Sequence, residues 1–262
     1  MTMKCDIIIV GVGGQGILTI AYLLDSAAIS KGLHVKQAEV HGMAQRGGAV
    51  YTHLRISDSP IISDVIPEGG ADMILGMEPL EIQRYLNYLN PGGMVITSNQ
   101  YYRNISNYPD EKAVLEALFK IGRVAVVDSK ALSMRGGSSQ GQNMAMVGMA
   151  TPWLPFEVKD YSPFVRQMFG RKGDAIVDAN VSVIGLGEKV GGFYKKLVDE
   201  KVSPRDAYLL MSKLDPVGLN VELAPRFIAA LKGSGAADRL VNLAPDSPCN
   251  AATLELIDGH RA

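Results

Sequence analysis

The chain has 262 residues, of which 47% are hydrophobic and 20% charged, and its formal net charge is −1. This composition is that of a globular protein, and the length suits one large domain or one domain with an extension. Proteins that follow nucleic-acid phosphates usually carry a basic surplus, so the balance of charges argues against a nucleic-acid partner. No apolar run approaches the ~20 residues of a membrane span or the pattern of a signal peptide, so we expect a cytoplasmic protein with no membrane partner.

Strands alternate with helices over the first 150 residues. In chain order, we expect a buried strand at 6–10, a glycine turn at 11–16, a helix at 17–30, strands at 34–40 and 49–56, and a hairpin or edge strand at 60–66. A strand at 71–75, a helix at 79–89, a turn at 90–93, a strand at 94–98, a helix at 111–121, a strand at 124–127 and a helix at 142–150 follow. This alternation predicts a three-layer α/β fold of Rossmann-like type, in which helices cover both faces of a mainly parallel sheet.

Helices alone are predicted after residue 151, at 155–169, 174–187, 204–214 and 223–231, with a short final helix beyond the Pro/Ser/Asn-rich stretch at 244–250. We therefore divide the chain into an α/β domain at 1–192 and a helical C-terminal extension at 193–262. The extension is too apolar to be disordered throughout, and we expect it to pack on the core or on a partner.

The sharpest local motif is the glycine loop Gly11-Val12-Gly13-Gly14-Gln15-Gly16, which follows a buried strand and opens a helix. Its glycines permit a tight turn, and the helix N-terminus offers free N–H groups to an anion such as a phosphate. Gly11, Gly13, Gly14, Gln15 and Gly16 are therefore candidate cofactor-binding residues. Glu39 stands about where a dinucleotide-binding fold carries its ribose-binding acid, so binding of NAD or FAD is one hypothesis.

A second polar, glycine-rich loop follows Glu39 and has no obvious counterpart in dinucleotide-binding folds. It holds an imidazole, an amide and a guanidinium within six residues and ends on a pair of glycines, and its candidate binding or interface residues are His41, Gln45, Arg46, Gly47 and Gly48. Loops at the ends of parallel strands often carry function, and the glycine pair would let another molecule approach closely. The alternative is that these polar side chains are merely solvated.

The sequence predicts neither a metal site nor a catalytic residue. Cys5 and Cys249 lie far apart and outside any Cys-x-x-Cys spacing, so we expect two reduced thiols rather than cluster ligands. His41 and His53 lack a recognisable nucleophile–base partner nearby. The methionines at 144, 146 and 149 and Trp153 are interpreted as core residues.

The two glycine-containing loops, 11–16 and 39–48, together resemble those of the indolepyruvate:ferredoxin oxidoreductase beta subunit. More broadly, they resemble the gamma-type domain of the pyruvate/ketoisovalerate ferredoxin oxidoreductases. The resemblance covers about residues 4 to 192 and continues at 66–69, 71–72, 77–81, 143–144, 170–172, Asn180, Gly185 and Gly187.

This resemblance implies a non-redox subunit that is inactive alone and pairs with a larger catalytic alpha subunit. In this family the partner carries thiamine diphosphate, Mg and [4Fe–4S] clusters. The complex oxidatively decarboxylates a 2-oxoacid with CoA, giving an acyl-CoA, CO2 and reduced ferredoxin. No Gly-Asp-Gly thiamine signature occurs in this chain, so we expect it to bind none of these cofactors itself.

The sequence leaves three functions open. The chain could be the oxidoreductase subunit, with the glycine loop and Arg46 holding CoA or the substrate carboxylate, since guanidinium groups suit such anions. It could be a stand-alone NAD- or FAD-binding protein that uses the glycine loop and Glu39. It could also be a purely structural partner whose loops form only an interface.

Overall fold

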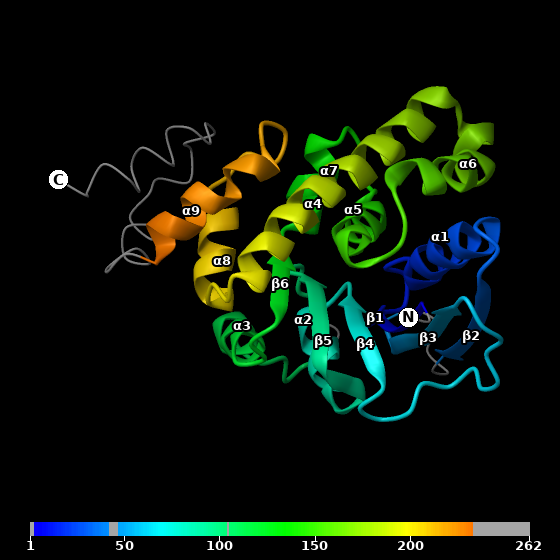
Figure 1. The fold of residues 1–262 in the computed structure, drawn as a ribbon, viewed down its shortest axis with the longest axis horizontal. Helices are drawn as coiled ribbons and strands as arrows, with labels where there is room; N and C mark the ends of the chain where they lie inside the picture. Colours follow the sequence, from blue (N-terminus) through cyan, green and yellow to red (C-terminus); the bar gives the residue numbers. More distant parts are fainter. Residues whose placement is uncertain (1–2, 42–46, 104, 233–262) are drawn as a thin grey trace.

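The computed structural model describes residues 3–41, 47–103 and 105–232. Within these residues, six strands form one sheet in the order β2-β3-β1-β4-β5-β6 (Figure 1). They are β1 (Lys4–Val12), β2 (His34–His41), β3 (Ala49–Ser57), β4 (Ala71–Gly76), β5 (Leu89–Ser98) and β6 (Val124–Val127). Strand β3 pairs antiparallel with β1 and β2, whereas β1, β4, β5 and β6 pair in parallel, so β3 alone runs against the other strands. The predicted mainly parallel α/β fold is confirmed.

Helices cover both faces of the sheet because successive side chains of its central strands are apolar and buried on both sides. Ile7 and Ile9 of β1 belong to a core cluster shared with α1 (Ile17–Ser30), α5 (Gln142–Ala150), α6 (Val158–Phe169) and α7 (Asp174–Asp199). Ile8 and Val10 belong to a second cluster with α2 (Pro79–Gln83) and α3 (Glu111–Phe119). The two clusters are the two sides of the predicted three-layer fold.

Several predicted elements differ from the structure. Residues 60–66 form no strand; this segment is held to the sheet by Lys36 Nζ, which donates to the Ile62 carbonyl, and by Arg55, which donates to Ser63 and Val65. The helix expected at 79–89 ends at Gln83, and a 3-10 turn follows at Leu86–Tyr88. The turn expected at 90–93 falls within β5, where pairing with β4 shifts register. Helix α4 (Ser129–Arg135) was not predicted.

Helices α5 and α7 cross with their backbones in direct contact. A Cβ atom on Gly148 would lie 2.1 Å from the Ile184 carbonyl oxygen, and one on Gly187 would lie 2.5 Å from the Ala145 carbonyl oxygen. Only glycine allows this approach, which fixes α5 and therefore Asn143 in its first turn. Met144, Met146 and Met149 of α5 are buried in the core, as predicted.

Helix α7 continues without a break through residues 192 and 193, between which the sequence divides the two domains. Beyond it, α8 (Pro204–Met211) packs against β6 and α9 (Ala224–Leu231) against α7. The buried Tyr194 hydroxyl donates to the Val126 carbonyl, and the rings of Phe193 and Phe227 lie 5.7 Å apart. Residues 193–232 thus pack on the α/β core. The final helix predicted after residue 250, and Cys249, lie outside the described residues.

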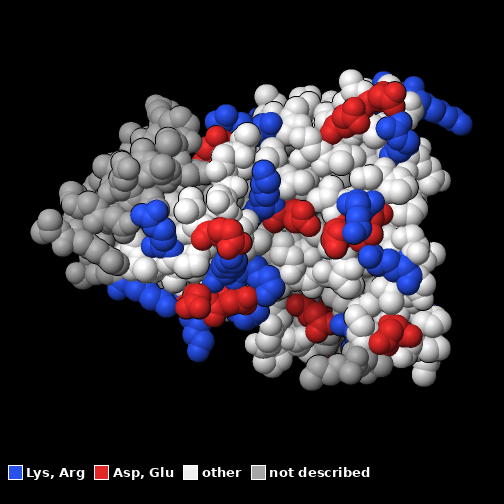
Figure 2. Space-filling model, turned by 45° about the horizontal axis from the view of Figure 1, so that its top comes forward, with Lys and Arg blue, Asp and Glu red and all other residues white. Residues whose placement is uncertain are grey.

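Acidic and basic side chains are interspersed on the face of the molecule drawn in Figure 2, with no single basic area. In the part of the chain that the structure describes, no helix is both long and apolar enough to cross a membrane.

Candidate functional site

The candidate site lies at the carboxyl ends of the parallel strands. The chain leaves β1 through α1 toward β2, but leaves β4 through α2 toward β5, so the order of the strands reverses between β1 and β4. In open α/β sheets, ligands bind outside the carboxyl ends of the strands at such a reversal. The glycine loop follows β1 at this point.

The glycine loop owes its shape to its glycines and to Gln15. Gly14 and Gly16 have φ of 101° and 80°, a backbone region that other residues seldom adopt. The Gln15 side chain accepts a hydrogen bond from the Val12 N–H (2.7 Å), and its Nε2 donates to the Met77 carbonyl at 3.5 Å, which links the loop to the end of β4. Gly16 precedes α1 without a side-chain cap, so the first turn of α1 keeps N–H groups that no side chain of Gly16 can satisfy.

The two sequence motifs meet through their backbones. The Gly13 N–H donates to the Gly48 carbonyl (2.8 Å), and the Gly47 N–H donates to the Gly13 carbonyl (3.4 Å). These bonds continue the pairing of β1 with β3, in which Val12 lies opposite Ala49. Of the second motif, the structure therefore places Gly47 and Gly48 beside the glycine loop. The backbone of His41 pairs with Val50 at the end of β2, whereas Gln45 and Arg46 lie outside the described residues.

A groove of about 500 Å³ opens beside the glycine loop. Its lining comes from segments that directly follow strand ends and from the start of α5: Gly14, Gln15, Gly16, Met77, Gln100, Tyr101, Tyr102, Lys130, Ser139, Gln140, Gln142 and Asn143. Lys130 is the one charged residue in this lining, and the remaining polar groups are amides and hydroxyls. The groove thus offers an anion one cation and several neutral hydrogen-bonding groups.

A second hollow of about 600 Å³ shares Ser139, Gln140 and Asn143 with this groove. Lys172 is the one charged residue in its described lining, and its Nζ lies 5.6 Å from the centre of the Phe169 ring. The two hollows adjoin at the first turn of α5 and are together called the depression; among the described residues, each lining has one lysine and neither has a carboxylate. Such a surface suits an extended ligand with more than one negative group.

Asn143 joins the glycine loop to α5. A Cβ atom on Gly16 would lie 2.6 Å from Asn143 Nδ2, so the amide packs directly on the glycine. Gly141 precedes α5 without a side-chain cap, as Gly16 precedes α1. Two helix N-termini, each with a partial positive charge, therefore open on the same depression as Lys130.

A buried carboxylate holds the segment that carries Tyr101 and Tyr102. Glu78 is 1% exposed; its Oε2 accepts from the Glu81 N–H (2.8 Å), and its Oε1 accepts from the Tyr108 hydroxyl. Burial is the main cause that holds the pKa of Tyr108 well above its usual range, and the hydrogen bond to Glu78 is the second. The anchored segment forms one side of the groove.

Lys130, Gln100, Tyr101 and Tyr102 were not predicted from the sequence as groove residues. They reach the glycine loop only through the order of strands in the sheet. One usable signal existed: Asp128 ends a predicted strand and can cap a helix, and its carboxylate does accept from the Ala131 N–H (2.8 Å) at the start of α4.

The placement of Glu39 argues against the dinucleotide hypothesis. Strand β3 separates β2 from β1, and two inter-strand spacings amount to roughly 10 Å. Glu39 is exposed on the edge strand, and its carboxylate accepts from Gln37 Nε2. A ribose-binding acid requires the second strand directly beside the glycine loop's strand.

His53 and Cys5, the other titratable residues considered for function, have structural positions. His53 is 3% exposed, and its Nδ1 accepts from the Ile66 N–H at 3.2 Å, so it occupies a position in the core. Burial raises the pKa of the Cys5 thiol to about 12, so this cysteine is poorly suited to bind a metal as thiolate. Among residues 3–41, 47–103 and 105–232, no group of three or more His, Cys, Asp or Glu is placed to hold a metal ion.

Comparison with known proteins identifies the family. The model of the pyruvate ferredoxin/flavodoxin oxidoreductase family matches residues 6–190. This chain belongs to that family. It is 36% identical over 194 residues to the indolepyruvate oxidoreductase subunit IorB of Archaeoglobus fulgidus, covering 71% of this chain and 94% of the relative. It is 37% identical over 195 residues to the protein of the same name from Thermococcus kodakarensis, covering 70% and 94%. The resemblance predicted from the two loops is confirmed.

Solved members of the oxidoreductase family share the fold. Pyruvate oxidoreductase subunit PORC from Thermotoga maritima has a TM-score of 0.53 and 20% identity, covering 70% of this chain and 94% of that one. The 2-oxoglutarate:ferredoxin oxidoreductase from Magnetococcus marinus, solved with 2-oxoglutarate, coenzyme A and succinyl-CoA bound, has a TM-score of 0.57 and 16% identity, covering 72% of this chain and 31% of that one. At these identities the likeness establishes the fold only.

Proposed function

We propose that this chain is the small, non-redox subunit of a 2-oxoacid:ferredoxin oxidoreductase whose substrate is an aryl 2-oxoacid such as indolepyruvate. The overall reaction would convert the 2-oxoacid and CoA to an acyl-CoA, CO2 and reduced ferredoxin. The names of the most similar relatives support the substrate class. A larger subunit would supply thiamine diphosphate, Mg and the [4Fe–4S] clusters, because the described part of this chain offers one buried cysteine and no metal-binding group.

Within this complex, we propose that the depression around α5 holds an anionic reactant, CoA or the 2-oxoacid carboxylate. The observation that carries this proposal is the lining: Lys130 and Lys172 each stand in one of two adjoining hollows that carry no acidic residue. CoA combines several phosphate charges with an amide-containing chain, which suits the two lysines and the amide and hydroxyl groups of the depression. We propose that Arg46, which lies outside the described residues, also serves this anion, as the sequence motif suggests.

The test is steady-state kinetics of the reconstituted two-subunit enzyme. Replacing Lys130 by Gln removes a charge-assisted contact, so the KM for CoA or for the 2-oxoacid should rise about tenfold while the complex still assembles. Lys112→Gln, at an exposed position on α3, is the matched control. Arg46→Ala tests the second motif in the same assay.

The same kinetics distinguish a role in binding the reactants from the purely structural alternative. If Lys130→Gln and Arg46→Ala leave both KM values unchanged in an assembled complex, the loops serve only as an interface. The proposed activity itself is tested by co-purification with the larger subunit and by viologen reduction with indolepyruvate, phenylpyruvate and hydroxyphenylpyruvate. An isolated chain that binds NADH or FAD would instead support the dinucleotide hypothesis.

A further inference from the structure

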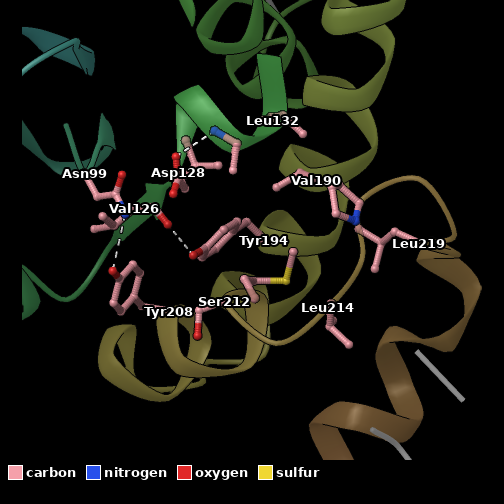
Figure 3. A pocket seen from close by; sticks show the side chains of 14 residues that line it. Asn99, Val126, Asp128, Leu132, Val190, Tyr194, Tyr208, Ser212, Leu214 and Leu219 are labelled. Atoms are coloured by element: carbon pink, nitrogen blue, oxygen red, sulfur yellow. Dashed lines mark hydrogen bonds between the residues drawn. The ribbon is translucent and has the colours of Figure 1, made fainter. Parts of the chain in front are cut away.

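A separate pocket of about 280 Å³ lies between the end of β6, α7 and α8 (Figure 3). Its walls are mainly apolar and include Val126, Leu132, Val190, Met211, Leu214 and Leu219. Half of the lining residues, from Tyr194 to Leu219, lie beyond residue 190, where the family match ends. The pocket is therefore built jointly by the family domain and by the segment that follows it.

The walls are rigidly tied to the sheet. The Tyr194 hydroxyl, which donates to the Val126 carbonyl, is fully buried, and α8 packs on β6 (Figure 3). Val190 and Leu219 are 4% and 5% exposed, so both belong to the core rather than to a loose surface loop. A preformed, mostly apolar cavity with a few polar groups is the usual form of a small-molecule site.

Among the described residues of this lining Asp128 alone is charged, and it is exposed to solvent. Its Oδ1 accepts from the Ala131 N–H (2.8 Å) and from Gln100 Nε2 (3.2 Å), which fixes the orientation of the carboxylate. In the described part of the chain no hydrogen bond to Oδ2 occurs. Beside it, Asn99 Nδ2 reaches the Tyr208 hydroxyl only at 3.5 Å, so this pair also keeps hydrogen-bonding capacity.

We propose that this pocket is a second binding site, for a small molecule that combines an apolar body with a protonated amine. The apolar walls would take the body, and the carboxylate of Asp128 would take the amine in a charge-assisted hydrogen bond. The same carboxylate repels anions, so neither CoA nor a 2-oxoacid fits here. The ligand of this pocket is thus distinct from the reactants proposed for the groove.

Three probes that share a phenylethyl body and differ in the charge of the head group test the proposal: 2-phenylethylamine, 2-phenylethanol and 3-phenylpropanoate. Each is titrated into the full chain carrying 13C-labelled methionine methyl groups, and the signal of Met211, assigned with Met211→Leu, reports on the pocket. The amine should shift this signal in a saturable manner and bind about threefold more tightly than the alcohol, with the propanoate weakest, because an exposed carboxylate adds less than about 1 kcal/mol to the binding of a cation.

Two substitutions locate the binding. Asp128→Asn retains a good helix cap but removes the charge, so the amine should lose its advantage over the alcohol. Ala131→Phe places a ring in the pocket from the exposed face of α4 and should abolish binding. Ala113→Phe is the matched control, because Ala113 is also exposed and its N–H donates to a capping aspartate, Asp110 (3.2 Å).

Saturable, amine-selective binding that both pocket substitutions weaken and Ala113→Phe leaves intact would support the site. The proposal is overturned if the wild-type chain binds none of the probes saturably, if it binds the amine and the alcohol equally, or if Ala131→Phe binds as the wild type does.

Discussion

The Gly13 N–H donates a 2.8 Å hydrogen bond to the carbonyl oxygen of Gly48. This bond joins the two motifs on which the family resemblance rests, and it lies at the end of the β1–β3 ladder. Because β3 runs antiparallel to β1, the start of β3 lies beside the end of β1. The second glycine loop, which precedes β3, therefore lies next to the first. In a purely parallel sheet the strand beside β1 would bring its opposite end there.

The contact between Gly16 and Asn143 should be measurable as a coupling energy. Gly16→Ala forces a left-handed backbone on alanine and places its Cβ 2.6 Å from Asn143 Nδ2. We expect a loss of about 2 kcal/mol of unfolding free energy, part of which Asn143→Ala should restore in the double variant. Gly14→Ala is the control, because Gly14 also has a positive φ but no atom lies within 4 Å of its Cβ position. Purely additive effects of Gly16→Ala and Asn143→Ala would contradict the contact.

The close crossing of α5 and α7 should be sensitive to a single methyl group, measured as a change in the free energy of unfolding. Gly148→Ala would force the helices apart, since its Cβ meets the Ile184 carbonyl oxygen, and we expect it to cost about 3 kcal/mol in chemical denaturation. Gly185→Ala, on α7, meets nothing within 4 Å and should stabilise the protein by up to about 1 kcal/mol through helix propensity. Equal effects of the two substitutions would show that the close crossing is absent.

These cases indicate what the sequence could and could not predict. The bounds of α1 were predicted at both ends, because a buried β-branched run, a glycine turn and a helical repeat are all local signals. The length of β5 was not, because Asn90-Pro91-Gly92-Gly93 is typical of a turn. In the structure this segment lies opposite the Ala71–Met73 irregularity, with Asn90 Nδ2 donating to Asp72 Oδ1 (2.8 Å).

The groove could be predicted only in part, for the same reason. The glycine loop and its anion-binding potential follow from a local motif. Lys130 does not, because it stands on a seven-residue helix with too few turns to display an apolar period. Its position depends on β6 lying at the end of the strand order, which is a property of the whole sheet.

The ion pair between Asp6 and Arg55 should contribute strongly to stability. Asp6 is 1% exposed, and both of its oxygens accept from the Arg55 guanidinium, at 2.9 and 3.0 Å. Arg55→Ala leaves this carboxylate buried with Lys4 as its one remaining described cation and also removes the bonds to the Ser63 and Val65 carbonyls, so we expect a loss of about 3 kcal/mol. Arg103→Ala, which breaks an exposed pair with Glu111, should cost less than about 1 kcal/mol in the same denaturation experiment. Similar losses in the two variants would contradict a special role for the buried pair.

His53 should make the protein less stable in acid. Burial lowers the pKa of its imidazole below the ordinary value of 6.5, so the unfolded chain takes up a proton at a higher pH than the folded chain does. Stability contributed by the neutral ring is therefore full above pH 6.5 and is lost as the pH falls through the lowered pKa. His53→Asn keeps an acceptor for the Ile66 N–H but cannot titrate. Between about pH 8 and about pH 5 the wild type should lose more unfolding free energy than His53→Asn, in which the other histidines are unchanged. Parallel losses would assign the acid sensitivity to other groups.

The hydrogen bond from Tyr108 to Glu78 should control how firmly the segment that carries Tyr101 and Tyr102 is held against the groove. Glu78 lies two residues beyond β4, and its buried Oε1 accepts from the Tyr108 hydroxyl and, at 3.5 Å, from the Tyr102 N–H, so Tyr108→Phe leaves that oxygen only the longer bond. Exposed Arg103 stands within the same segment and offers a trypsin site. We expect Tyr108→Phe to speed cleavage after Arg103 severalfold under native conditions, because local opening costs less once the anchor is lost. Tyr102→Phe removes a hydroxyl from a residue that is 45% exposed and should leave the cleavage rate unchanged. Equal cleavage of the wild type and Tyr108→Phe would mean that other contacts hold the segment, and that Glu78 serves only to cap α2.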